Sequence, residues 1–269
     1  MKVRIATWNI NSVRRRIESV ERFVTEYKPD ILCLQETKVH DDAFPMKAIK
    51  AMGFEHVEIN GMKAYHGVAT FSKIPLTKVE KIEFCNKGDA RHLAISFNTP
   101  SSGEVTVHNF YVPAGGDVAD VDENEKFKHK VDFLGEMTEI FSKLSNDDSA
   151  ILVGDLNIAP HENDVWSHKQ LIKVVSHTPF EVELLKKLQD SMDFQDMVRE
   201  YVPVSEKLYS WWSYRSKDWT QSNKGRRLDH VWVSQPLKDK HKGMEIVLAP
   251  RSWEAPSDHA PILADFDFS

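Results

Sequence analysis

The sequence lacks several features that would place it in other classes of protein. Its two cysteines, Cys33 and Cys85, lie far apart, which argues against a disulfide framework and a cysteine-ligated zinc site and favours reduced thiols. It has no uninterrupted apolar stretch of about 18 residues, and charged side chains interrupt residues 1–5. We therefore expect no membrane span, no secretory signal and a cytoplasmic location.

The chain also lacks the overall positive charge that is common among nucleic-acid-binding proteins. It has 35 Lys and Arg against 41 Asp and Glu, a formal net charge of −6. Positive charge is concentrated locally, because residues 207–227 contain six basic side chains and one acidic side chain, a local net charge of +5. Phosphates respond to charge within a Debye length, so any affinity for nucleic acid must come from such a local face.

Repeats, low-complexity tracts and Gly/Ser linkers are absent as well, so we expect one domain over residues 1–269. Apolar residues make up 41% of the chain and charged residues 28%, which is typical of a globular protein and not of a disordered one. Residues 3–8 predict a buried strand, residues 13–27 an amphipathic helix and residues 31–34 a second strand. This order predicts a βαβ-like opening.

Further strands and helices are predicted from short apolar runs and from apolar residues spaced three or four apart. Residues 101–103 indicate a hairpin turn between two of the strands. Some strands are thus joined by hairpins and others through helices, which predicts an α/β fold with mixed sheets. The remaining strands are predicted at residues 67–71, 92–97, 105–112, 150–153, 228–233 and 262–266, and the helices at residues 127–144 and 180–188.

Five apolar runs stop at, or begin from, side chains that can bind a metal or a phosphate: residues 8–11, 34–37, 154–157, 227–230 and 257–261. Loops at the ends of strands are where rigid scaffolds present chemistry. Three carboxylates in these runs, Glu36, Asp155 and Asp258, together with amides and a histidine, suit a hard cation such as Mg²⁺. Thiolates and a multi-histidine set are absent from the runs, so a zinc hydrolase is disfavoured.

Taken singly, each of these residues has an ordinary structural explanation. Gly154-Asp155 fits a simple turn, Glu36 fits a helix cap, and Tyr111 fits the buried face of a strand. Asp229 is harder to explain in this way, because a carboxylate inside an apolar run is costly without a partner. His259 is a plausible partner for it.

Together and in this order, the segments resemble the exonuclease/endonuclease/phosphatase superfamily. Residues 35–42 (QETKVHDD) and 210–216 (SWWSYRS) resemble the exonuclease III branch of AP endonucleases. The resemblance covers essentially the whole chain. It implies a four-layered α/β sandwich, with two mixed β-sheets packed face to face and helices outside.

The resemblance also implies a role for each matching position. Asp155 would activate the attacking water, and His259, held by Asp229, would stabilise charge on the phosphorus centre. Asn157 would position Asp155, and Tyr111 would assist the leaving oxygen. The metal, Mg²⁺ with Mn²⁺ as an alternative, would lie at or near the following residues, with Glu36 as its central ligand: Asn9, Glu36, Asp155, Asn157, Asp258 and His259.

Residues 208–227 interleave aromatic and basic side chains, which suits stacking on bases and neutralising of phosphates. Adjacent side chains of an extended chain point to opposite faces, so Trp211 and Trp212 cannot both enter one core. We expect Trp212 to face DNA; the alternative is that several of these aromatics are core residues. The predicted DNA contacts are Asn9, Asn11, Arg91, Trp211, Trp212, Arg215, Lys217, Lys224 and Arg226.

Arg14, Arg15 and Arg16 follow the first polar loop. They fit two explanations equally well, contact with a phosphate near the site and a solvated helix face. At residues 211–213 the family carries Trp, Phe and Asp, whereas this chain has Trp212 and Ser213 in the last two places. The loss of that acid leaves the balance between endonuclease and exonuclease activity open.

The resemblance implies a Mg²⁺-dependent nuclease that cuts duplex DNA 5′ to abasic sites, with 3′→5′ exonuclease and 3′-repair diesterase activity. Its partner would be double-stranded DNA with abasic sites or blocked 3′ ends, and we expect a monomer. One alternative is another phosphoesterase of the superfamily, acting on undamaged DNA or small phosphoesters. A second alternative is a DNA-binding module without catalytic activity, which would require damage to the metal- or water-binding set.

Overall fold

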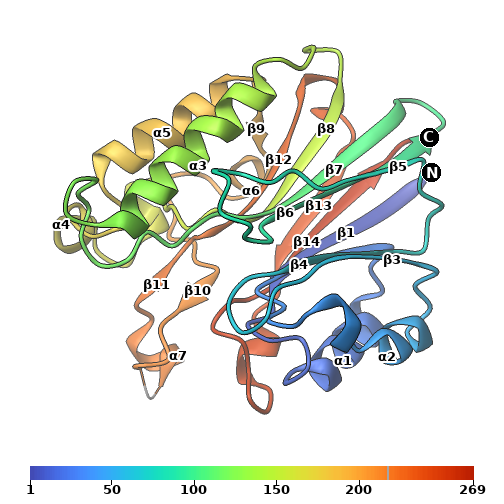
Figure 1. The fold of residues 1–269 in the computed structure, drawn as a ribbon, viewed down its shortest axis with the longest axis horizontal. Helices are drawn as coiled ribbons and strands as arrows, with labels where there is room; N and C mark the ends of the chain where they lie inside the picture. The colour runs from blue at the N-terminus through green and yellow to red at the C-terminus, as the bar shows by residue number, and fades with distance from the viewer. Residues whose placement is uncertain (217) are drawn as a thin grey trace.

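Two mixed six-stranded sheets form the centre of the protein, in a computed structural model that describes residues 1–216 and 218–269 (Figure 1). The first sheet has the order β13-β14-β1-β2-β4-β3 and the second the order β5-β6-β7-β8-β12-β9. The strands of the first are β1 (Lys2–Asn9), β2 (Ile31–Gln35), β3 (His56–Asn60), β4 (Val68–Ser72), β13 (His241–Ile246) and β14 (Ile262–Asp267). Those of the second are β5 (Lys78–Glu80), β6 (His92–Thr99), β7 (Gly103–Tyr111), β8 (Ser149–Asp155), β9 (Gln195–Asp196) and β12 (Asp229–Val233).

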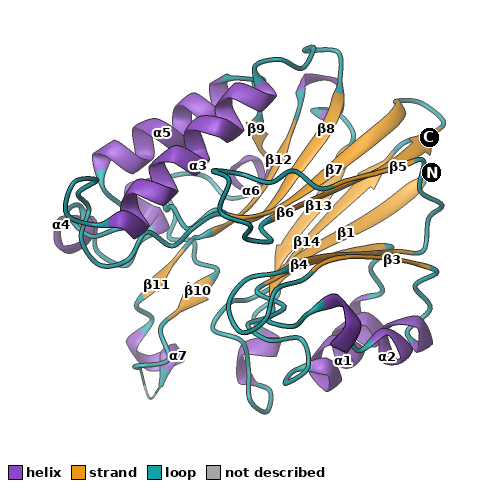
Figure 2. Ribbon diagram, in the orientation of Figure 1, coloured by secondary structure: helices purple, strands orange, loops and turns teal. Residues whose placement is uncertain are grey.

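Helices cover the outer faces of both sheets (Figure 2). On the first sheet lie α1 (Ile17–Tyr27) and α2 (Met46–Ala51), and on the second lie α3 (Glu125–Phe141) and α5 (Pro179–Asp190). Apolar side chains of both sheets, such as Ile5, Val107 and Val231, pack in one cluster between them. The predicted sandwich of two mixed sheets with outer helices is confirmed. The shorter helices are α4 (His168–Leu171), α6 (Met197–Tyr201) and α7 (Trp219–Ser222).

The first helix begins later than predicted. Residues 3–8 and 31–34 do form strands, and β1 pairs with β2 in parallel, which confirms the βαβ-like opening. However, Asn11 and Ser12 have φ angles of 48° and 89°, and the chain makes a turn before α1 begins at Ile17. The apolar Val13 that suggested an earlier start is buried outside the helix. Short or half-exposed strands such as β3, β5 and β13 were not predicted, because few of their side chains are buried.

Register brings the polar strand ends together at one edge of the sandwich. β1 and β2 run parallel with Asn9 opposite Gln35, and β7 and β8 run parallel with Tyr111 opposite Asp155. The carboxyl ends of parallel strands meet at the same edge, so the residues that follow them lie close together. The antiparallel β12 begins at this edge, where Asp229 lies opposite Asp155.

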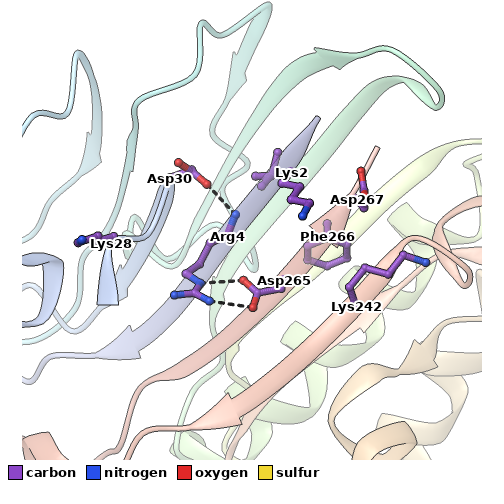
Figure 3. A pocket seen from close by; sticks show the side chains of 9 residues that line it. Lys2, Arg4, Lys28, Asp30, Lys242, Asp265, Phe266 and Asp267 are labelled. Atoms are coloured by element: carbon purple, nitrogen blue, oxygen red, sulfur yellow. Dashed lines mark hydrogen bonds and ion pairs between the residues drawn. The ribbon is translucent and has the colours of Figure 1, made fainter. Parts of the chain in front are cut away.

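A groove of about 600 Å³ lies at the other end of β1 (Figure 3). There Arg4 makes two parallel hydrogen bonds to Asp265 of β14, at 2.7 and 2.9 Å, and its backbone N donates to Asp30. Both side chains of the ion pair are 39% exposed, so it contributes little to stability. These contacts join β1 to β14, and to the start of β2, at the end of β1 that is remote from Asn9.

Among the described residues, none of the helices combines the length and the apolar character that crossing a membrane requires.

Candidate active site

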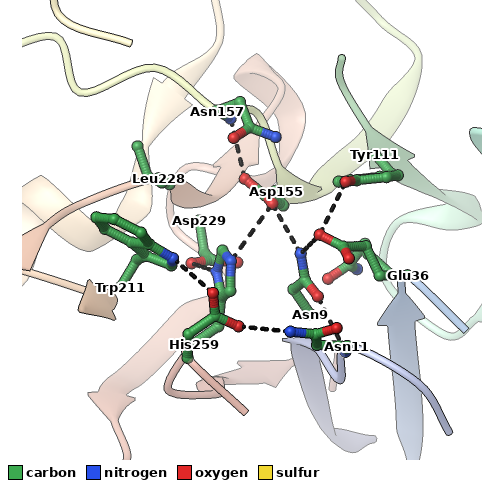
Figure 4. A network of polar contacts seen from close by, with 12 residues as sticks. Asn9, Asn11, Glu36, Tyr111, Asp155, Asn157, Trp211, Leu228, Asp229 and His259 are labelled. Carbon is green, nitrogen blue, oxygen red and sulfur yellow. Dashed lines mark hydrogen bonds and ion pairs between the residues drawn. The ribbon is translucent and has the colours of Figure 1, made fainter. Parts of the chain in front are cut away.

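Asn9 lies at the centre of the polar edge and links its two main carboxylates (Figure 4). Its Nδ2 donates to Glu36 Oε1 and to Asp155 Oδ2, each at 2.9 Å. Its Oδ1 accepts from the backbone N of Asn11 at 3.1 Å. In this orientation Asn9 supplies a donor to the carboxylates. The prediction that Asn9 lies near the metal or its waters stays a prediction, and its amide adjoins both carboxylates of the site.

Glu36, Asp155 and His259 form a candidate metal site. One ligand atom of each lies within 4.8 Å of those of the other two. Two carboxylates at this separation repel each other unless a cation lies between them, and hard oxygen ligands suit a divalent ion such as Mg²⁺. Lys38 Nζ, 2.8 Å from Glu36 Oε2, supplies one positive charge at the rim.

The buried pair of Asp229 and His259 adjoins this site. His259 Nδ1 donates to Asp229 Oδ2 at 2.8 Å, and His259 Nε2 lies 3.7 Å from Asp155 Oδ2. Ser210 Oγ donates to the same Asp229 oxygen at 2.6 Å, which fixes the carboxylate. Burial opposes the charged imidazole, but Asp229 and Asp155 outweigh it and raise the pKa of His259 to about 10. The predicted partnership of Asp229 and His259 is therefore present. As the imidazolium, His259 has a proton on both ring nitrogens, so the carboxylates of Glu36 and Asp155 are the metal ligands that this group of three offers.

Asp155 is buried at the end of β8 and is held from two sides. Besides the contact with Asn9, its Oδ1 accepts from the backbone N of Asn157 at 3.0 Å. Asn157 in turn donates from Nδ2 to Val112 O at 2.9 Å. Burial raises the pKa of Asp155, against the opposing effect of the His259 charge. A carboxylate with a raised pKa is a stronger base than a solvated one.

Tyr111 contacts the other carboxylate. Its hydroxyl donates to Glu36 Oε1 at 2.8 Å, and burial together with Glu36 raises its pKa well above the ordinary value, so the phenol stays protonated. Arg91 packs over the tyrosine ring, 4.9 Å from its centroid, and pairs with Asp89. Arg91 is largely buried and supports Tyr111, and because it also lines the hollow beside that ring, its predicted DNA contact stays a prediction.

Asp258 lies beside the candidate metal site without being one of its three members. Its Oδ2 accepts from Trp211 Nε1 at 2.9 Å and its Oδ1 from Asn11 Nδ2 at 3.0 Å. Both carboxylate oxygens are thus occupied by neighbouring side chains. Trp211 and Asn11 thus hold Asp258 in place beside the site, and its predicted place near the metal or its waters stays a prediction.

The expectation that Trp212 faces DNA is wrong. Trp212 is only 3% exposed, and its Nε1 donates to Asn223 Oδ1 at 3.0 Å. Its ring packs 4.9 Å from that of Trp219 and lies beneath the Arg251 guanidinium. The two tryptophans do point to opposite faces of β10 (Trp211–Trp212), as an extended chain requires, but Trp211 is the one beside the site.

The other predicted DNA contacts differ in their exposure. Arg215 and Lys224 are exposed, and Lys224 lies over the Trp166 ring. Arg226, on β11 (Gly225–Arg226), is partly buried and donates to Ser176 Oγ at 2.7 Å. Lys217 lies outside the described residues.

The three consecutive arginines also differ in their exposure to solvent. Arg14 and Arg15 are exposed, whereas Arg16 is buried and donates to Ala255 O and to Tyr214 Oη. Arg16 therefore holds two loops together.

Sequence reasoning missed two residues of the site. Lys38 pairs with Glu36 and also donates to Asn11 Oδ1 at 2.6 Å, and Ser210 holds Asp229. Lys38 lies in the motif of residues 35–42 and Ser210 in that of residues 210–216. Their place in these motifs could have identified them as residues of the site.

The chain matches the model of the "Endonuclease/Exonuclease/phosphatase family" over residues 6–259. The chain belongs to this family. Haemophilus influenzae exodeoxyribonuclease III is 32% identical to it, over 98% of this chain and 100% of that protein. The exodeoxyribonuclease of Bacillus subtilis is 27% identical, over 97% and 98% of the two chains.

Two solved structures are similar over nearly the whole length. The AP endonuclease of Archaeoglobus fulgidus has a TM-score of 0.89 and 30% identity, and it covers 98% of this chain and 99% of its own. A 3′ phosphatase from Neisseria bound to product DNA hairpin has the same TM-score, identity and coverage. The predicted resemblance to the exonuclease III branch is confirmed. These relatives place the chain among the nucleases, which are phosphodiester hydrolases.

Proposed function

We propose that this member of the family is a Mg²⁺-dependent DNA-repair nuclease that cleaves duplex DNA 5′ to abasic sites. The observation that carries the proposal is the joint presence, at one edge of the sandwich, of a carboxylate base, an imidazolium held by Asp229, and the candidate metal site. A non-catalytic DNA-binding module would not need this complete set. The substrate assignment draws on the relatives named above and on the surfaces beside the site.

Asp155 is suited to take the proton of the attacking water, because burial raises its pKa and two donors fix its orientation. The His259 imidazolium places its Nε2 on the same side as Asp155, where it can stabilise charge that develops on the phosphate. Asp229 and Ser210 keep that imidazole from rotating. The protonated Tyr111 hydroxyl is placed to donate to a phosphate or leaving oxygen near Glu36.

Glu36 and Asp155 would hold the Mg²⁺ ion, which when bound neutralises phosphate oxygens and stabilises the leaving alkoxide. Lys38 and Asn9 orient these carboxylates from either side. Mn²⁺ fits the same oxygen ligands.

Two hollows flank this centre and support a strand of DNA as the substrate. One, of about 520 Å³, is lined by Arg15, Arg16 and Lys38. The other, of about 630 Å³, adjoins Tyr111 and is lined by Lys87 and Lys126. Phosphates on both sides of the scissile bond would thus meet positive charge, which a small phosphoester could not use.

Trp211 provides the apolar surface that the damage specificity requires. It packs with Leu228 and Val165 beside Asp258. A sugar without a base is already unstacked, so turning it towards such a surface costs less than turning a normal nucleotide.

Removal of blocking groups from 3′ ends is a second candidate function. It is favoured by the inward position of Trp212, which therefore does not serve as the aromatic wedge expected of it. The Neisseria neighbour, a 3′ phosphatase bound to product DNA hairpin, supports the same alternative.

One experiment separates the two candidates. Three end-labelled duplexes are incubated with the protein and Mg²⁺: one with a single internal abasic analogue, one with a 3′-phosphate and one undamaged. Cutting 5′ to the abasic analogue, lost with chelator and in Glu36→Gln, supports the main proposal. Removal of the 3′-phosphate with the internal abasic site left intact would favour the second candidate, and hydrolysis of none of the three would overturn both.

A further inference from the structure

The buried side chain of Lys130 contacts two loops of the active site. Lys130 lies on α3 and has no exposed surface. Its Nζ lies 2.5 Å from Glu181 Oε1, 2.8 Å from Asn157 O and 3.4 Å from Ala114 O. An ammonium group has three N–H donors and no acceptor. The three oxygens therefore satisfy all of its hydrogen-bonding capacity.

The two carbonyls belong to the segments that carry the reacting groups. Ala114 follows Tyr111 at the end of β7, and Asn157 follows Asp155 at the end of β8. These strands are parallel neighbours with Tyr111 opposite Asp155. One cation beneath the site therefore ties the loop of the phenol to the loop of the base.

Asn157 transmits this contact to Asp155. Its φ is 54°, a left-handed conformation that asparagine adopts more readily than most residues. In that conformation its N donates to Asp155 Oδ1, its Nδ2 donates to Val112 O and its carbonyl faces Lys130. Loss of the Lys130 contact would free the carbonyl to turn away, and the peptide that orients Asp155 would turn with it.

Glu181 gives Lys130 a fixed anchor. Its carboxylate accepts from Ser176 N at 2.9 and 3.0 Å and from Thr178 Oγ1 at 2.7 Å, as the acid of the capping box that begins α5. Because these donors hold the carboxylate in place, it cannot follow a moving lysine. Lys130 is thereby held to the rigid start of a helix.

A contribution to folding stability does not by itself explain the buried ion pair of Lys130 and Glu181. A buried ion pair loses hydration that its attraction barely recovers, and apolar replacements of both partners are often neutral or stabilising. Burial indeed lowers the pKa of Lys130, with Glu181 opposing.

We propose that Lys130, anchored by Glu181, is a positioning residue that holds Asn157, and through it Asp155, in the catalytic orientation relative to Tyr111. This inference deepens the proposed function and rests on the same site.

The test uses Lys130→Met/Glu181→Gln, which removes both charges and keeps an oxygen acceptor for the donors of Ser176 and Thr178. We expect a folded protein in which kcat on the abasic duplex falls at least tenfold while KM stays within about twofold, because an orienting contact acts on the reaction and not on binding. Amide hydrogen exchange should accelerate at residues 112–116 and 156–159 and stay unchanged in β1 and β2. The matched control is Lys128→Met on the same helix, whose exposed pair with Asp132 should be dispensable for all three quantities.

A folded double variant with wild-type kcat and wild-type exchange in both loops would overturn the inference. Hydrogen exchange needs no substrate, so it tests the role of Lys130 even if the wild-type protein leaves the abasic duplex intact and the proposed function fails. If the double variant does not fold, Glu181→Gln alone replaces it. It leaves the ammonium in place without its anchor, and the same loops should exchange faster with a smaller loss of kcat; unchanged loops there would again overturn the inference.

Discussion

Asp155 and Asp229 lie directly opposite each other in the antiparallel pair of β8 and β12, and both are almost fully buried. Two facing carboxylates in an apolar setting repel strongly unless a cation lies between them. The His259 imidazolium supplies that charge, with Nδ1 on Asp229 and Nε2 towards Asp155. One strand register thus places the two carboxylates on either side of the same imidazole.

Asp229→Asn should lower kcat by about 100-fold or more while the protein stays folded. The amide keeps the shape of the carboxylate but removes the charge that maintains the imidazolium. Steady-state rates on the abasic duplex, with circular dichroism to check folding, provide the measurement. Asp265→Asn, at a surface pair remote from the site, is the control. Wild-type turnover in Asp229→Asn would contradict the role given to this pair.

Glu36→Gln should weaken the binding of the divalent ion at least tenfold, because it removes one of two carboxylates from the candidate metal site. Titration with Mn²⁺, followed by water proton relaxation, measures this directly and needs no substrate. Glu80→Gln is a suitable control, because this side chain on β5 is 43% exposed. Equal Mn²⁺ affinity in the wild type and in Glu36→Gln would place the ion elsewhere.

Trp211→Ala and Trp212→Ala should have different effects. Trp212 is buried against Trp219, so its truncation should cost about 3–5 kcal/mol of unfolding free energy. Trp211 is partly exposed beside Asp258, so its truncation should mainly raise KM. Urea unfolding and steady-state kinetics on both variants check the two expectations. A large stability loss in Trp211→Ala with normal KM would reverse the assignment.

The buried pair of His92 and His108 should make stability depend on pH. Burial lowers the pKa of His108 to about 4 and that of His92 well below its ordinary value of 6.5. Both imidazoles are therefore neutral in the folded protein, whereas the unfolded chain binds protons below pH 6.5. The unfolding free energy should fall as the pH drops from about 6.5 to 4, by about 3 kcal/mol for His108 alone.

Urea unfolding at several pH values measures this dependence. His108→Leu should flatten the slope, and the exposed His40→Leu should leave it unchanged. An equal slope in all three proteins would show that other groups cause the acid sensitivity.

Much of the fold could be predicted because local patterns determine it. The apolar runs of β1, β2 and β8 and the helical spacing of α3 appear in short windows, and the hairpin turn before β7 appears in three residues. Strands such as β13 could not be predicted, because an edge strand with few buried side chains has no clear apolar periodicity.

The sequence by itself determined which kinds of side chain end the strands, and the cost of a carboxylate inside an apolar run indicated that Asp229 needs a partner. Tertiary structure decided which of them meet. Trp211 and Asn11 donate to Asp258, Asp89 engages Arg91, and Trp212 turns inward to Trp219 and Arg251. Each outcome depends on residues that are distant in sequence, whose approach is determined by packing and strand register and not by any local pattern.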